Sequence, residues 1–113
     1  MNVKGQDPTD LIAGLLPRST CAVQVAACLV DEFGVYAWGW NSSGSTGMGE
    51  HAEAHCFRRA NHRRLSESTL YVIAQRLKNG VSVSARPCLE CQPLAAKCAR
   101  TLYRDKDGIW KQL

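Results

Sequence analysis

Two short segments, far apart in the chain, carry side chains that bind transition metals. His51-Ala52-Glu53 supplies an imidazole and a carboxylate, and Pro87-Cys88-Leu89-Glu90-Cys91 supplies two thiols at i, i+3 spacing. A catalytic zinc site takes three protein ligands and keeps a fourth position open for water. His51, Cys88 and Cys91 match that number and type of ligand, so the fold has to bring the two segments together.

The sequence predicts a helix at each of these segments. A proline suits the first turn of a helix, because its missing N–H has no partner there, and Pro87 precedes the two thiols. We therefore expect residues 88–100 to be helical, with both thiols on one face of the first turn, where a helix terminus favours thiolates. Residues 51–65 are predicted to form another helix, which His51 opens.

Together, the His-x-Glu and Pro-Cys-x-x-Cys motifs resemble the signature of the zinc-dependent cytidine/deoxycytidylate deaminase superfamily, and the resemblance extends from about Cys21 onward. It implies that His51, Cys88 and Cys91 bind Zn²⁺ and that Glu53 is the catalytic acid and base. In this superfamily the glutamate takes a proton from the activated water and delivers it to a ring nitrogen of the base, and ammonia leaves.

The same resemblance implies three substrate contacts: the side chain of Asn41, the backbone of Ala52 and the carbonyl of Arg86. An asparagine amide donates and accepts hydrogen bonds, which suits a sugar hydroxyl or a base edge. The alternative is that Asn41 is a turn residue that leads into Ser42-Ser43-Gly44.

Other interpretations of the motifs are weaker. Cys-x-x-Cys alone occurs in redox pairs and in structural zinc sites. His55 forms an i, i+4 pair with His51, as in zinc proteases, but that motif needs a glutamate directly after the first histidine, where this chain has Ala52. We therefore expect His55 to be a packed or supporting residue.

Length and composition are those of an ordinary globular protein. The 113 residues predict a single domain, 1–113, and the net charge of +4 is below that of a dedicated nucleic-acid binder.

The residues after Lys4 are polar and do not form the apolar segment of a signal peptide, and no apolar run reaches membrane-spanning length. We expect a cytoplasmic protein with reduced thiols, in which Cys21, Cys28, Cys56 and Cys98 act as small apolar residues.

The pattern of apolar residues and turns predicts an α/β fold. A short helix over residues 11–16 precedes strands at 21–30 and 35–41, which form an antiparallel hairpin. Further strands are predicted at 69–74, 101–103 and 109–111, and the last two must be antiparallel if they pair, because a parallel connection needs a dozen or more residues. With the resemblance, this implies a three-layer α/β/α cytidine-deaminase-like fold with a five-stranded mixed sheet.

The aromatic side chains of the second predicted strand alternate along it. Tyr36, Trp38 and Trp40 therefore share one face of the strand, where we expect them to pack between sheet and helix. Residues 42–50 are rich in glycine, which predicts a mobile loop that enters the site before His51.

A group of cationic residues lies at the far end of the second predicted helix. They form either a solvated helix end or a patch that binds phosphate. These residues are Arg58, Arg59, His62, Arg63 and Arg64.

The resemblance does not point to one subfamily. The antiparallel ending resembles the free-nucleoside cytidine deaminases and several bacterial toxin deaminases. A histidine at the position of His51 is shared with the toxins and with the deoxycytidylate, tRNA-adenosine and polynucleotide-cytosine deaminases. We expect hydrolytic deamination of cytidine, deoxycytidine or a monophosphate by a homo-oligomer. The alternatives are a deaminase of single-stranded DNA or RNA and a non-catalytic, zinc-stabilised binding module.

Overall fold

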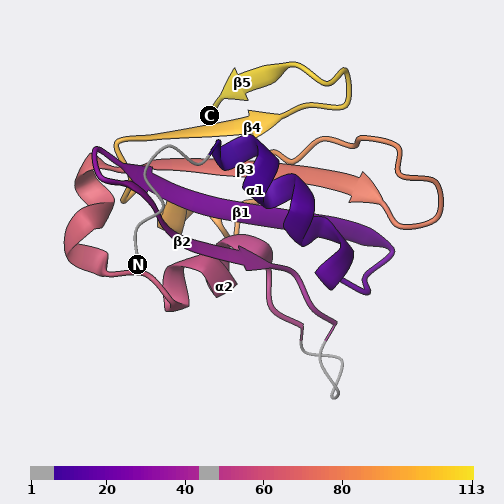
Figure 1. Ribbon diagram of the computed structural model, residues 1–113, viewed down its shortest axis with the longest axis horizontal. Helices are drawn as coiled ribbons and strands as arrows, with labels where there is room; N and C mark the ends of the chain where they lie inside the picture. The colour runs from indigo at the N-terminus through magenta and orange to yellow at the C-terminus, as the bar shows by residue number, and fades with distance from the viewer. Residues whose placement is uncertain (1–6, 44–48) are drawn as a thin grey trace.

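Five strands form one mixed sheet in the order β2-β1-β3-β4-β5 (Figure 1). The computed structural model describes residues 7–43 and 49–113. β1 is antiparallel to β2 and to β3, β3 is parallel to β4, and β4 is antiparallel to β5. The predicted antiparallel ending is therefore confirmed. The strands are β1 (Val23–Asp31), β2 (Gly34–Trp40), β3 (Thr69–Arg76), β4 (Arg100–Arg104) and β5 (Trp110–Gln112).

Helices cover both faces of this sheet, which confirms the three-layer architecture. Helix α1 (Pro8–Leu15) lies on one face and buries Ile12 and Leu15 against β1 and β3 (Figure 1). Helices α2 (Ala52–Arg58) and α3 (Gln92–Ala95) share the other face. Two 3₁₀ helices follow α1 and α2, namely η1 (Leu16–Arg18) and η2 (His62–Glu67). No helix in the described parts of the chain is long and apolar enough to cross a bilayer.

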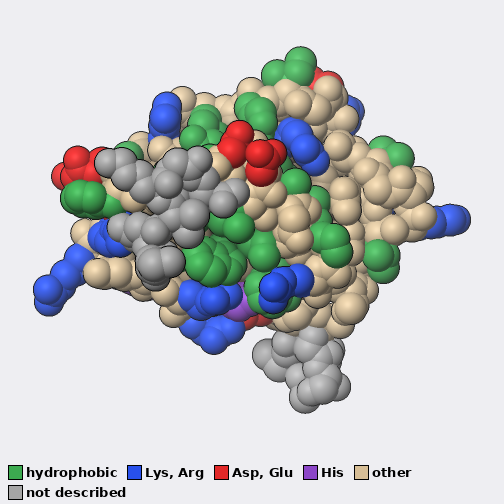
Figure 2. Space-filling model, in the orientation of Figure 1, with side chains coloured by type: hydrophobic (Ala, Val, Ile, Leu, Met, Phe, Trp, Pro, Cys, Tyr) green, Lys and Arg blue, Asp and Glu red, His purple; other side chains and the backbone are tan. Residues whose placement is uncertain are grey.

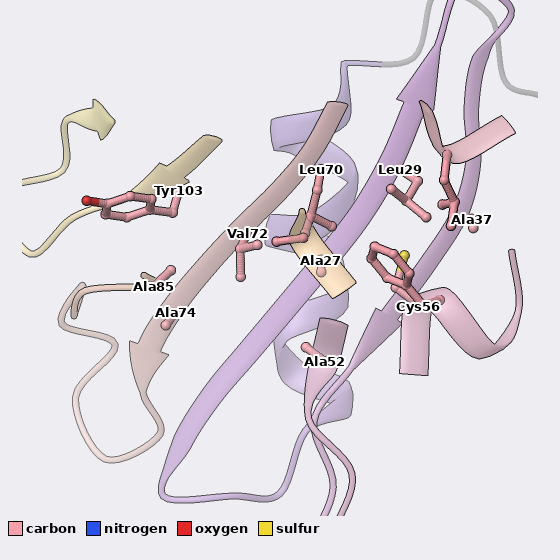
Figure 3. Packing of buried hydrophobic residues seen from close by; sticks show 13 residues of the cluster. Ala27, Leu29, Ala37, Ala52, Cys56, Leu70, Val72, Ala74, Ala85 and Tyr103 are labelled. Carbon is pink, nitrogen blue, oxygen red and sulfur yellow. The ribbon is translucent and has the colours of Figure 1, made fainter. Parts of the chain in front are cut away.

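The central strand β1 is buried on both faces because its sequence is apolar at consecutive positions. Ala26 and Cys28 face α1, whereas Ala27 and Leu29 face α2, and all four side chains are fully buried. A strand covered on both faces has this continuous apolar pattern rather than an alternating one. Figure 3 shows Ala27 and Leu29 among the side chains that gather between the sheet and α2.

The two predicted long helices are shorter than expected. The prediction of a helix over residues 51–65 is wrong in its extent: α2 ends at Arg58, and the side chain of Asn61 starts η2 by accepting a hydrogen bond from Arg63 N. Asparagine often competes with helical hydrogen bonds in this way. The prediction of a helix over residues 88–100 is also wrong, because α3 has one turn. The chain then leaves the helix to enter β4, and Ala99 N donates to Ser68 O.

A β-bulge separates the aromatic side chains of β2, so the prediction that they share one face is wrong. The register between β1 and β2 shifts at Leu29 and Val30. Such an irregularity breaks the alternation of side chains between the two faces. Tyr36 packs with the cluster under α2, whereas Trp38 and Trp40 pack with the cluster under α1.

Gly39 lets the backbone of α2 lie directly on β2. A Cβ atom at this position would lie 2.6 Å from Cys56 N and 3.0 Å from Ala52 O. Both neighbours are backbone atoms of a packed helix and cannot turn away. The close approach therefore requires glycine at position 39.

We predict that Gly39→Ala destabilises the protein by about 1–3 kcal/mol, the usual cost of forcing an extra methyl group into a packed interior. Urea unfolding followed by circular dichroism measures the change. Gly14→Ala is the matched control, since a Cβ at Gly14 meets no atom within 4 Å and alanine is favoured in helices. Equal stability of Gly39→Ala and the wild type would contradict the close-approach argument.

A partly buried ion pair connects η2 to the end of β1. Arg64 Nε lies 2.5 Å from Asp31 Oδ2 and Arg64 Nη2 lies 2.7 Å from Asp31 Oδ1, while the guanidinium stacks 4.0 Å from the ring centre of Tyr36. Only 6% of the Asp31 side chain is exposed. The hydrogen bonds from Arg64 hold the pKa of Asp31 below its usual value of 3.8.

A carboxyl whose pKa is lowered by folding stabilises the native state above its unfolded pKa, and this contribution is lost as the pH falls through the folded pKa. We predict that the free energy of unfolding decreases on acidification from pH 7 to pH 3. The Asp31→Asn variant should be less stable than the wild type at pH 7, and its free energy of unfolding should change less with pH. Urea titrations at several pH values test this. Glu67→Gln, at an exposed position, is the control and should show the same change in the free energy of unfolding with pH as the wild type. If Asp31→Asn also shows the wild-type change, the Asp31–Arg64 pair does not contribute to the pH dependence of stability.

Candidate active site

The structure brings the three predicted zinc ligands together. His51 Nδ1 lies 3.2 Å from Cys91 Sγ and 3.5 Å from Cys88 Sγ, and the three donor atoms lie within 4.8 Å of one another. A tetrahedral zinc ion with bonds of about 2.0–2.3 Å separates its ligand atoms by roughly 3.3–3.8 Å. One imidazole nitrogen and two sulfurs are also the donors that zinc prefers. The residues therefore fit Zn²⁺.

The start of one helix and a tight turn before another position these donors. His51 is extended (φ −70°, ψ 152°) and directly precedes α2. Cys88 and Cys91 lie in the tight turn before α3, which is closed by hydrogen bonds from Cys91 N and Gln92 N to Cys88 O, both 3.0 Å. The thiols therefore do not lie inside the first turn of a long helix, as predicted, but their i, i+3 spacing still places both sulfurs beside His51.

The cluster leaves a coordination position without a protein side chain. Within residues 7–43 and 49–113, no fourth His, Cys, Asp or Glu joins it. His55 is held elsewhere: its Nδ1 accepts a hydrogen bond from Trp40 N at 3.2 Å, and its ring meets the Trp40 ring edge-on at 4.7 Å. This confirms the prediction of a packed His55. An open position is typical of catalytic rather than structural zinc sites.

Glu53 is the buried acid beside the cluster. Only 5% of the residue is exposed, and burial raises the pKa of its carboxyl, while interactions with His51 and Cys91 partly oppose the shift. A carboxylic acid with a raised pKa exchanges protons more readily near neutral pH. The position next to the metal donors therefore suits the acid and base role predicted for Glu53.

A cavity of about 190 Å³ adjoins the cluster and collects the other predicted site residues. Asn41, Ala52, Glu53 and Arg86 all line it. Ala52 is the first residue of α2, where a backbone N–H has no acceptor within the helix. Cys91 is buried and does not line this cavity. The remaining lining residues are Val25, His51, Ser84, Ala85 and Cys88.

Most of the hydrogen-bonding capacity of Asn41 is used inside the protein. Its Oδ1 accepts from Ser19 Oγ at 2.6 Å and from Val25 N at 2.9 Å, and its Nδ2 donates to Val23 O at 2.8 Å. One Nδ2 hydrogen is left over, since an amide group donates two. Both sequence interpretations therefore have a basis: the residue fixes the start of β1, and it lines the cavity.

Sequence reasoning missed three residues of the cavity wall. Val25 lies in the buried apolar strand, where nothing distinguishes it from its neighbours. Ser84 and Ala85 directly precede Arg86, so their place before the cysteine motif was a usable signal. Residues 44–48 of the predicted mobile loop lie outside the described residues.

The predicted arginine cluster is divided among different contacts. Arg58 makes two hydrogen bonds of 3.0 Å with Glu50, and Arg64 pairs with Asp31. Arg59 stacks on Trp38, with its Cζ 5.4 Å from the ring centre. Two of the five cations are therefore paired with carboxylates, which leaves less positive charge at the end of α2 for the phosphate-binding alternative.

Two comparisons with known proteins agree with this geometry. The family model of the cytidine and deoxycytidylate deaminase zinc-binding region matches residues 14–103. A crystal structure of cytidine deaminase from Burkholderia pseudomallei is similar in fold, with a TM-score of 0.73 and 15% identity, over 98% of this chain and 92% of that chain. No curated protein matches the sequence.

We predict that replacing His51, Cys88 or Cys91 by alanine strongly reduces the zinc content of the purified protein, from about one ion per chain, because three donors hold the ion. Elemental analysis of dialysed protein measures the zinc. Cys21→Ser is the control, as Cys21 belongs to neither core cluster. Full zinc occupancy in His51→Ala, or an equal loss in Cys21→Ser, would contradict the assignment.

Proposed function

We propose that this chain, which belongs to the family of the cytidine and deoxycytidylate deaminases, hydrolyses the amino group of a cytosine-type base in a nucleoside or nucleotide. The family and the His51, Cys88 and Cys91 cluster make it a zinc deaminase. The observation that carries the proposal is a buried carboxyl, Glu53, beside these donors at the wall of a cavity.

The reaction replaces the C4 amino group of cytosine by oxygen from water and releases ammonia. His51, Cys88 and Cys91 would hold the zinc ion, whose Lewis acidity would make a water molecule a stronger nucleophile. A carboxylate oxygen of Glu53 accepts the proton that the attacking water loses, and delivers it to the ring nitrogen N3. The hydroxyl group then on C4 loses its proton to the Glu53 carboxylate, which passes it to the amino group. The C4–N bond breaks, ammonia leaves and the C4 carbonyl forms, so the carboxylate is again unprotonated.

The cavity wall offers contacts for both halves of such a substrate. The backbone of Ala52 and the carbonyl of Arg86 would bind the polar edge of the base, since a carbonyl oxygen accepts a hydrogen bond from an amino group. The remaining Nδ2 hydrogen of Asn41 would bind a hydroxyl of the sugar. These roles are supported by the position of all three residues on one cavity.

The open coordination position argues against a purely structural role. A structural zinc site closes all four positions with protein ligands, and neither His55 nor Cys56 joins the three donors found in the described residues. The burial of the Glu53 carboxyl beside the three donors also supports a catalytic role, because burying a carboxyl costs desolvation free energy that a purely structural centre would not require.

We predict that Glu53→Gln keeps zinc and the fold but lowers deamination by at least about 10²-fold, the usual minimum contribution of a general acid and base. Mass spectrometry measures products from cytidine, deoxycytidine, their monophosphates and adenosine. Glu32→Gln, in the exposed β1–β2 turn, should retain activity.

Two results would contradict the proposal in different ways. Full activity of Glu53→Gln would remove the residue from the mechanism. Turnover of adenosine, with none of the cytosine compounds, would keep the zinc chemistry but reject the proposed substrate.

A further inference from the structure

The outer edge of strand β2 carries arginines stacked on tryptophans. Arg18 Cζ lies 5.1 Å from the ring centre of Trp40, and Arg59 Cζ lies 5.4 Å from that of Trp38. His55 adds an edge-on contact to Trp40. Figure 2 shows blue and purple side chains beside green ones along the lower border of this face, where Figure 1 places β2. We call the set Arg18, Trp38, Trp40, His55 and Arg59 the β2 edge.

The two stacked arginines keep their charge available. Both residues are exposed, and neither forms an ion pair with a carboxylate in the described parts of the chain. This differs from Arg58, whose charge Glu50 neutralises. Stacking on an indole holds a guanidinium in place without compensating its charge.

The backbone of this edge strand is already bound. Trp40 N donates to His55 Nδ1 at 3.2 Å, and Arg59 Nη1 donates to Trp38 O at 3.4 Å. An added β-strand would need these same backbone groups. The β2 edge is therefore better suited to a partner that binds side chains than to strand addition.

The β2 edge ends at the catalytic cavity. Asn41, which lines the cavity, directly follows Trp40. Ser19, the residue after Arg18, donates its hydroxyl hydrogen to Asn41 Oδ1. His55 belongs to the same helix as Glu53. A ligand on the β2 edge would therefore lie close to Asn41, one of the residues that line the cavity.

We propose that the β2 edge binds single-stranded nucleic acid. Cationic side chains contact the phosphates of a strand, and aromatic rings or guanidinium planes stack on its unpaired bases. Because Trp38 and Trp40 also pack with the cluster under α1, the guanidinium planes of the exposed Arg18 and Arg59 are the surfaces offered to bases. The two indoles beneath them are two residues apart in a strand, about 6.6 Å along its axis. A duplex offers no free base faces, so this surface favours a single strand. Binding here does not depend on which cytosine compound is deaminated.

The test is a fluorescence titration of the zinc-loaded, full-length protein with oligothymidylate of about 12 nucleotides. Thymine has no exocyclic amino group, so the result is independent of the proposed deamination. We expect binding that quenches tryptophan fluorescence and weakens between about 50 and 200 mM salt. Trp110→Phe should retain the quenching, because Trp110 lies on β5 at the opposite edge of the sheet, whereas Trp38→Phe combined with Trp40→Phe should lose it.

The double variant Arg18→Gln, Arg59→Gln tests the charges at two exposed positions and leaves both tryptophans in place. We expect weaker binding and a slope of log K against log salt that is shallower by about 1.4, or roughly 0.7 for each lost phosphate contact. Lys78→Gln with Lys106→Gln removes the same net charge from two exposed turns and should bind nearly as the wild type does. No binding at 50 mM salt, equal binding by the two double variants, or equal affinity for a duplex would overturn the proposal.

Discussion

The site and the surface beside it depend on the direct contact of α2 with β2 at Gly39. A helix normally stands off a sheet by the length of the side chains between them, but here backbone atoms of Ala52 and Cys56 lie where a Cβ would be. This contact fixes the height of α2 above the sheet. Glu53 and His55 within the helix, His51 directly before it and Arg59 directly after it take their positions from this contact.

The second half of the site comes from the single parallel pair in the sheet. Parallel strands need a long crossover, and the connection between β3 and β4 carries Arg86, Cys88 and Cys91 over the face that α2 covers. The antiparallel pairs around it need no such connection. One crossover is thus enough to bring the cysteines to the histidine, and this is how a chain of 113 residues completes the site.

The charged side chains near the site fall into three groups: a buried acid, arginines paired with carboxylates, and arginines stacked on indole rings. The buried acid, Glu53, lies at the metal donors, where desolvation raises its pKa. Arg58 forms an exposed ion pair with Glu50, and Arg64 forms an ion pair with Asp31 that connects η2 to the end of β1. Arg18 and Arg59 rest on indole rings instead. An arginine paired with a carboxylate therefore has a structural role, whereas an arginine stacked on an indole ring keeps its charge available to a ligand.

The sequence alone determined the donor set, the acid beside it, the five strands and the antiparallel ending, because spacing and short connections are local properties. Only the tertiary structure decided how far the helices run, since Asn61 and the entry into β4 end them. It also decided which face Tyr36 takes, because a bulge reverses the alternation, and which arginines are paired. The cavity wall is likewise tertiary: Val25 and Ser84 meet only when β1 and the crossover are folded together.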